Sequence, residues 1–349
     1  MSREDPTHVR LPGGAAGAAP VCAALAPAPA AAAPLSILES FGARAHPVAE
    51  LTWGLLALAV FVTALISALL LIAMARPGEP ESEGSPWPDA RSGSGRALRW
   101  IYAGLALTVI ALIGCGAWTL QVLGALRPPE AGPAVVVAVT GHQWWWEVEY
   151  RAADGLPAVE TANEIHVPAG RPVRIELRSA DVIHSFWVPA LAGKTDAIPG
   201  QLNVAWLEAD APGVFAGVCA EYCGLQHAHM ALRVVARTPE GYAEWRRAQA
   251  AAAPPPRDAR AEAGRALFLQ RCAACHAVRG TPAQGEVGPD LSHLMSRPML
   301  AAGAAVNDAA HLAAWIHDPD ALKPGARMPA AGLDGAELAA LRDWLLTLE

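Results

Sequence analysis

The chain has 349 residues, a net charge of −7 and a mean hydropathy of +0.25, and 53% of its residues are hydrophobic. A chain of this length holds about two or three domains. The hydrophobic share is high for a soluble protein and indicates membrane segments, while an acidic balance without a basic stripe excludes nucleic acid as a partner. Four of the six cysteines form two tight pairs, which excludes a disulfide framework.

The first 46 residues are rich in Ala, Pro and Gly, a composition that does not bury a core. We expect no fold over 1–46. Cys22 lies in an apolar stretch that prolines interrupt, and removal of a signal segment or lipidation of Cys22 stays open.

Two uncharged apolar runs follow, Leu51 to Ala75 and Ile101 to Leu126. Each exceeds the roughly 20 residues that a helix needs to span a bilayer. Because backbone groups in lipid must be hydrogen-bonded internally, both runs are predicted to be transmembrane helices. Together they form a membrane hairpin within 47–127.

The basic residues predict the orientation of this hairpin. The connecting loop carries four arginines near the spans, namely Arg76, Arg91, Arg96 and Arg99. The outer flanks offer mainly Arg44 and Arg127. Since cytoplasmic loops carry the excess of basic residues, the part of the chain after residue 126 is expected outside the cytoplasm.

From Ala134 the chain changes to short β-branched segments separated by Gly and Pro, which is typical of strands. The expected strands are Ala134–Thr140, Glu164–Val167, Pro172–Arg178, Gln201–Leu207 and Met230–Ala236. This spacing predicts an all-β sandwich over 128–247 with a helix near its end. The Ala/Pro-rich stretch 248–259 then reads as a linker.

A cluster of metal-ligating side chains lies at the end of the predicted sandwich. Cys219, Cys223, His227, His229 and Met230 fall within twelve positions. Thiolate, thioether and imidazole favour copper over magnesium, calcium or manganese. Zinc sites usually space their thiols as C-x2-C and rarely use methionine. Two thiolates on one loop can bridge two metal ions, which favours a dinuclear copper centre.

Other interpretations of these residues remain. His184 is the obvious ligand from outside the loop, and Asp181 either bonds a ligand or forms a turn. His229 is expected to be a surface or outer imidazole. A disulfide between Cys219 and Cys223 is the alternative to a metal site, although it would explain none of the nearby His and Met residues.

The last domain, 260–349, contains Cys272-Ala273-Ala274-Cys275-His276, the C-x-x-C-H signature of covalent haem attachment. A redox dithiol or a zinc site is the alternative. Met328, in a proline-framed loop, is the expected sixth iron ligand, with Met295 and Met299 as competitors. Helical spacing near both ends of the domain predicts an all-α fold.

The cysteine loop, with its pattern C-x-E-x-C-G-x-x-H-x-x-M, resembles the dinuclear copper (CuA) loop of subunit II of the haem-copper oxidases. The segments Gly141–Trp146, Asp181–Trp187 and Lys194–Gly200 share the resemblance. It implies a cupredoxin-like sandwich, copper bound by the side chains of His184, Cys219, Cys223, His227 and Met230, and electrons entering at Trp144. Glu221 would offer its carbonyl to copper and its carboxylate to magnesium at the subunit I interface.

The C-terminal domain resembles class I cytochrome c, with haem c held by Cys272, Cys275, His276 and Met328. The chain is thus expected to be membrane-anchored and multidomain, with a two-helix hairpin, a cupredoxin-like sandwich and a cytochrome c domain. It would be subunit II of a cytochrome c oxidase, an oxidoreductase and translocase, multi-pass in a bacterial-type inner membrane with periplasmic copper and haem domains.

The implied path of electrons runs from cytochrome c or another respiratory donor through haem and copper to subunit I, which reduces oxygen to water and pumps protons. Subunit III and membrane lipid are further expected partners. Two alternatives stay open: a membrane-tethered haem and copper carrier or copper-delivery protein, and a subunit of a nitric oxide or nitrous oxide reductase.

Overall fold

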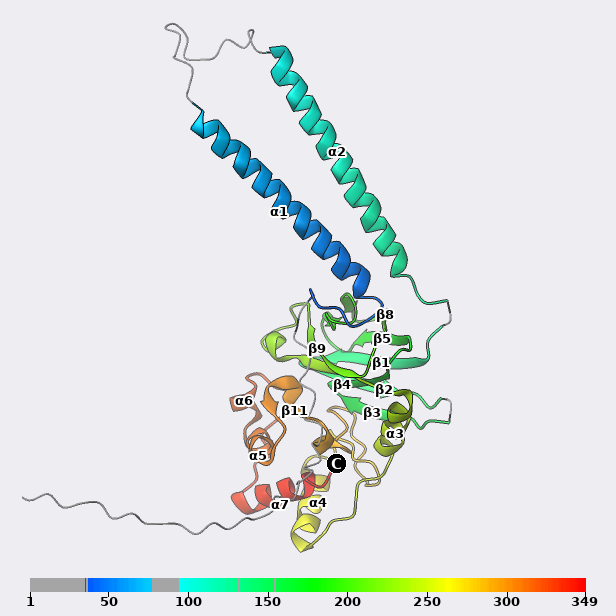
Figure 1. Cartoon of the computed structure of the whole chain (residues 1–349). Helices are drawn as coiled ribbons and strands as arrows, with labels where there is room; N and C mark the ends of the chain where they lie inside the picture. The colour runs from blue at the N-terminus through cyan, green and yellow to red at the C-terminus, as the bar shows by residue number, and fades with distance from the viewer. Residues whose placement is uncertain (1–34, 36, 77–93, 131, 154) are drawn as a thin grey trace, which may run out of the picture. The chain divides into compact units, whose positions relative to one another are not determined.

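The computed structural model describes residues 35, 37–76, 94–130, 132–153 and 155–349. Cys22 and Arg91 lie outside these residues. Two helices are long and apolar enough to cross a membrane, α1 (His46–Ala75) and α2 (Ser94–Ala125). Figure 1 draws α1 and α2 as two long helices. Most of their large apolar side chains are exposed, which suits lipid contact. The two predicted apolar helices are therefore present.

The helices approach each other closely where a glycine faces a tryptophan. A Cβ atom on Gly54 would lie 2.2 Å from the ring of Trp118. Small residues allow such contacts between membrane helices. At the end of α2, the Arg44 guanidinium donates to the backbone carbonyls of Leu126 and Arg127 at 2.5 and 2.7 Å.

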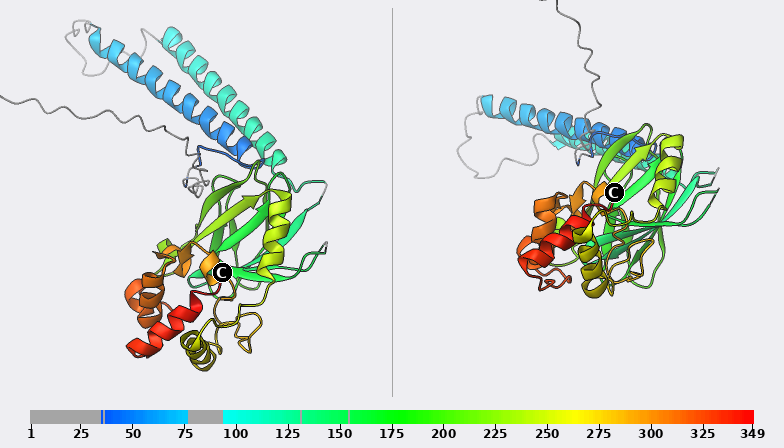
Figure 2. Two further views of the ribbon diagram at one scale, coloured as in Figure 1. Left: turned by 60° about the horizontal axis from the view of Figure 1, so that its bottom comes forward. Right: turned by 90° about the horizontal axis from the view of Figure 1, so that it is seen from below.

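Two five-stranded sheets form the middle of the chain (Figure 2). The first has the order β3-β2-β1-β5-β8, comprising β1 (Val135–His142), β2 (Trp145–Tyr150), β3 (Val159–Ala162), β5 (Val173–Ser179) and β8 (Asn203–Leu207). The second has the order β4-β10-β9-β6-β7, comprising β4 (Glu164–Pro168), β6 (His184–Trp187), β7 (Thr195–Ala197), β9 (Gly213–Cys219) and β10 (Ala231–Arg237). Helix α3 (Pro239–Gln249) follows the last strand.

Alternation of buried and partly exposed residues along the strands produces the core between the sheets. Val137 and Val139 on β1 are fully buried, while their neighbours are partly exposed. Trp146 from the first sheet packs edge-on against Phe186 from the second, with ring centroids 6.0 Å apart. These contacts join the two inner faces of the sandwich.

All five expected strands are present, and their ends differ from the expected ones by at most two residues. Among the described residues of the sandwich, five further strands were missed, namely β2, β3, β6, β7 and β9. Strands β6 and β7 contain four and three residues, too few to show a periodic pattern. Strand β2 has the sequence Trp-Trp-Glu-Val-Glu-Tyr. It begins within a run of tryptophans, and such a run indicates packing in a core without indicating a strand.

The C-terminal part is mainly helical and has its own core. Its elements are α4 (Ala259–Arg271), α5 (Ala309–His317), α6 (Pro319–Leu322), α7 (Gly335–Leu345), the 3₁₀ turns η2 (Leu294–Ser296) and η3 (Ala301–Gly303), and the short strands β11 (Met299–Leu300) and β12 (Ala305–Val306). Helix α4 crosses α7 at Gly264, where a Cβ atom would lie 2.0 Å from the carbonyl oxygen of Ala340. The rings of Phe268 and Trp344 pack together beside this crossing, with their centroids 4.9 Å apart.

The helix crossing predicts a strong effect of one methyl group. Gly264→Ala should separate α4 from α7 and destabilise the helical domain by about 1–3 kcal/mol, the usual cost of overpacking. Gly335→Ala is the control, because a Cβ atom there meets open space. Denaturant unfolding of both variants measures the difference. Equal midpoints would contradict the close crossing.

Candidate metal centre and haem cavity

The sandwich gathers the predicted copper ligands at one end. The two thiol sulfurs of Cys219 and Cys223 lie 3.8 Å apart. His184 Nδ1 is 3.9 Å from Cys219 Sγ, and His227 Nδ1 is 3.6 Å from Cys223 Sγ. The Met230 thioether lies 3.8 Å from Cys223 Sγ. Both cysteines are free, so a disulfide does not explain this cluster, whereas its soft donor set fits copper.

Strand pairing brings these ligands together from distant parts of the chain. Strands β6 and β9 are antiparallel neighbours, with Phe186 opposite Cys219. His184 at the start of β6 therefore lies beside the end of β9. The loop after β9 returns to β10, and the Cys219 N–H closes it by donating to the Met230 carbonyl at 3.1 Å.

Asp181 orients the His184 ring from behind. Its carboxylate accepts hydrogen bonds from His184 Nε2 at 2.8 Å, from the Val182 N–H at 2.7 Å and from the Gln143 N–H at 2.8 Å. With Nε2–H donated to Asp181, Nδ1 keeps its lone pair and faces the cysteines. Asp181 thus bonds both a candidate ligand and neighbouring backbone groups.

The two thiols differ in acidity because they share a hydrogen bond. The bond from Cys223 Sγ, together with His184 and nearby backbone groups, lowers the pKa of Cys219 to about 3 in spite of burial. The same bond and burial raise the pKa of Cys223 well above its usual value. A cation bound to both sulfurs would release the remaining proton.

Three other predicted residues surround the cluster. The Glu221 carbonyl oxygen lies 3.3 Å from Cys219 Sγ, while Glu221 as a whole is exposed. His229 is also exposed and bonds to Gln226 at 2.7 Å, as expected of a surface imidazole. Trp144 Nε1 donates to the Cys223 carbonyl at 3.0 Å, so this indole contacts the backbone of the ligand loop directly.

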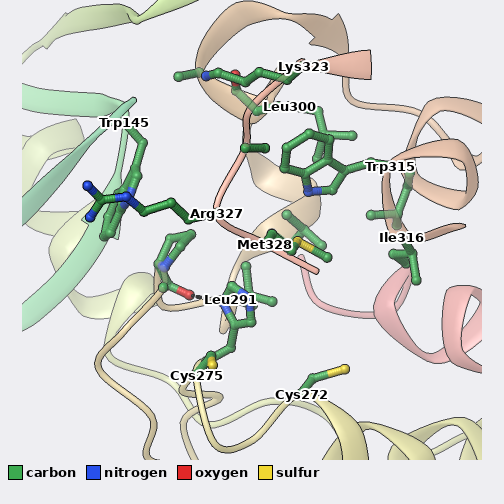
Figure 3. A pocket seen from close by; sticks show the side chains of 18 of the residues that line it. Trp145, Cys272, Cys275, Leu291, Leu300, Trp315, Ile316, Lys323, Arg327 and Met328 are labelled. Atoms are coloured by element: carbon green, nitrogen blue, oxygen red, sulfur yellow. Dashed lines mark hydrogen bonds between the residues drawn. The ribbon is translucent and has the colours of Figure 1, made fainter. Parts of the chain in front are cut away.

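A cavity of about 440 Å³ brings together the predicted haem residues Cys272, Cys275, His276 and Met328 (Figure 3). His276 Nδ1 donates to the Pro289 carbonyl at 2.8 Å, which leaves Nε2 as the nitrogen available to iron. Burial lowers the pKa of His276, which favours the neutral imidazole. Of the two competing methionines, Met299 lines the cavity and Met295 packs in the helical core.

Two further features show that the cavity fits haem. Gly288 supports the His276 ring, because a Cβ atom there would lie 2.6 Å from His276 Cε1. Arg297 lines the cavity at 7% exposure, and its Nε has no partner in the part of the chain that is described. Arg297 Nη2 donates to the Asp290 carbonyl at 2.5 Å, which leaves the Nε–H to donate to a further anion, and haem carries two carboxylates.

The sandwich supplies part of the cavity wall through its tip residues His142, Gln143, Trp144, Trp145 and Asn163. The His142 and Trp145 rings stack at 4.4 Å. Figure 3 shows Trp145 and Arg327 beside the cavity. The sequence did not indicate this wall, because Trp145 belongs to no recognisable ligand pattern.

The contact between β1 and the His184 ring gives a test of the metal centre. Gly141→Ala would place a Cβ atom 2.7 Å from His184 Cδ2 and tilt the ring. Copper affinity should fall by about 10–100-fold, the usual effect of disturbing the support of a ligand. Competition with a chelator measures it. Gly193→Ala, which meets open space, is the control, and equal affinities in the two variants would refute the support by Gly141.

Comparisons with known proteins agree with the two candidate sites. Residues 152–237 match the family "Cytochrome C oxidase subunit II, periplasmic domain", and residues 261–349 match "Cytochrome c". Cytochrome c oxidase subunit 2 of Alkalihalophilus pseudofirmus is 36% identical over 294 residues, which are 81% of this chain and 83% of that protein. The protein of the same name from Bacillus sp. strain PS3 is 35% identical over 62% of each chain.

A solved periplasmic domain of subunit II of cytochrome oxidase from Bradyrhizobium japonicum is 32% identical, covering 35% of this chain and 96% of that one with a TM-score of 0.33. The extent of the match to the A. pseudofirmus protein, reaching across both domains, decides the assignment. The chain belongs to the cytochrome c oxidase subunit 2 family.

Proposed function

We propose that this chain carries electrons from a covalently bound haem c to a dinuclear copper centre through Trp144. One observation carries the proposal. Trp144 lines the haem cavity, and its indole Nε1 donates a hydrogen bond to the carbonyl of Cys223 at 3.0 Å. One residue thus connects the two candidate redox sites.

In this proposal the copper ligands are His184, Cys219, Cys223, His227, Met230 and the Glu221 carbonyl, and the haem is held by Cys272, Cys275, His276 and Met328. When bound, copper and haem supply the one-electron chemistry. The protein holds the ligands on a rigid sandwich, Asp181 fixes the orientation of His184, and the apolar cavity wall excludes water. Iron held by the Met328 thioether and the His276 imidazole would have a higher reduction potential than iron held by two imidazoles.

The membrane arrangement belongs to the same proposal. Helices α1 and α2 form a two-pass hairpin in a bacterial-type inner membrane, with the domains at 128–247 and 260–349 in the periplasm and 248–259 as their linker. The exposed Glu221 is suited to bind magnesium at the interface with subunit I. Subunit III and lipid complete the surroundings of the hairpin.

We place the external donor on the haem domain. Segment 323–327 covers Trp144, since a Cβ atom on Gly325 would lie 3.6 Å from the indole ring. Cytochrome c or another respiratory donor would therefore reduce the haem and not reach Trp144 itself. Membership of the oxidase family favours this reading over a tethered carrier or a nitrogen-oxide reductase subunit.

The ligand role of Met328 is open to a redox titration. Met328→Ala should lower the haem potential by on the order of 100 mV, since axial ligands tune haem over about 0.8 V. Met299→Ala, which changes another methionine of the cavity wall, is the control. A potential that falls in Met299→Ala and stays constant in Met328→Ala would reassign the ligand.

Assembly can be tested by purifying the tagged full-length chain from its membrane. A polytopic subunit I should copurify, and the complex should consume oxygen with reduced cytochrome c as donor. Recovery of the chain alone, with haem and copper but no oxygen consumption, would support a tethered carrier instead.

A further inference from the structure

A single buried lysine lies at the contact between the haem domain and the copper domain. Lys323 follows α6 and is 4% exposed. Its Nζ lies 2.7 Å from the Trp144 carbonyl, 2.9 Å from the His229 carbonyl and 2.8 Å from the Ala301 carbonyl. The first two acceptors belong to the copper domain and the third to the haem domain.

These three carbonyls match the chemistry of an ammonium group. An ammonium has three N–H donors, and each finds one acceptor here. Burial lowers the pKa of Lys323 to about 7, which Cys223 partly opposes. Lysines are rarely buried to this extent without a partner. The site is complete only while the two domains are in contact, because the acceptors come from both.

The residues after Lys323 extend the contact. Gln226 Nε2 donates to the Pro324 carbonyl at 2.8 Å, and the Arg327 guanidinium donates to Gln143 Oε1 at 2.7 Å. The next residue is Met328, the proposed iron ligand. The loop that presents this ligand to the haem cavity is therefore the same loop that binds the copper domain.

The composition of the chain also sets Lys323 apart. Only Lys194 and Lys323 are lysines among the 26 basic residues, and the others are arginines. A guanidinium is planar and directs its donors in a fixed fork, whereas an ammonium is a compact point charge. Three carbonyls that converge on one atom suit the ammonium and not the guanidinium.

We propose that Lys323 is a positioning residue that clamps the haem domain onto the copper domain and so fixes the haem cavity against Trp144. This inference rests on the proposed function. Other contacts between the haem domain and the copper domain do not involve Lys323. One of them is the hydrogen bond from the Arg279 guanidinium to the Ala158 carbonyl at 3.3 Å. Loss of the clamp should loosen the contact without separating the domains.

The test uses the full-length chain in its complex, with Lys323→Met as the variant. Lys194→Met is the matched control, because it removes the other lysine, which is exposed on the copper domain. Hydrogen–deuterium exchange is measured at 226–230 and 299–303. Flash photoreduction of the haem gives the rate of electron transfer to copper at two solvent viscosities.

We expect Lys323→Met to keep the haem and copper spectra while exchange rises in both segments. Electron transfer to copper should slow by about tenfold or more, because small misplacements of reacting groups carry large rate penalties, and it should become dependent on viscosity. Lys194→Met should behave as the unmodified chain. Exchange and transfer rates that are unchanged in Lys323→Met would overturn the clamp.

Lys323→Arg covers the case in which the methionine variant does not fold. It keeps the charge but cannot direct three donors at the three carbonyls, so transfer should again slow. A rate and exchange pattern equal to the unmodified chain would overturn the assigned geometry. If the proposed function itself were wrong, the result would differ from a failure of the clamp, because the unmodified chain would then show no electron transfer from haem to copper.

Discussion

The pairing of β6 with β9 is the constraint on which the copper site depends. It sets Phe186 opposite Cys219 and so holds His184 within 3.9 Å of the first thiol. All other candidate ligands lie on the loop that follows β9. Because the β-sandwich is rigid, the ligands are close together before a metal binds. Asp181 supports the His184 ring from the side opposite the cysteines.

The haem site depends on a second association, between the helical domain and the tip of the sandwich. The helical domain contributes the C-x-x-C-H cysteines, His276 and Met328, while the sandwich contributes Trp144 and Trp145 to the same cavity wall. The two candidate redox sites consequently share residues. Trp144 lines the cavity, donates its indole N–H to the copper loop and accepts a hydrogen bond from Lys323 at its carbonyl.

The parts of the fold and of the candidate sites that depend on neighbouring residues could be predicted from the sequence. Uncharged runs indicated α1 and α2, β-branched segments indicated five strands, and the spacing of Cys, His and Met marked both candidate sites. The missed strands β6 and β7 are too short for periodicity to reveal, yet β6 carries His184. Lys323 could not be assigned a role, because its partner Trp144 lies 179 residues away and a lysine before a proline has no distinctive pattern.

The most direct test of the account is the metal and haem stoichiometry of the purified full-length protein, combined with its electron paramagnetic resonance spectrum. The account predicts two coppers for each covalently bound haem and an unpaired electron shared between both copper ions. A single copper, or none with Cys219 and Cys223 joined as a disulfide, would contradict it.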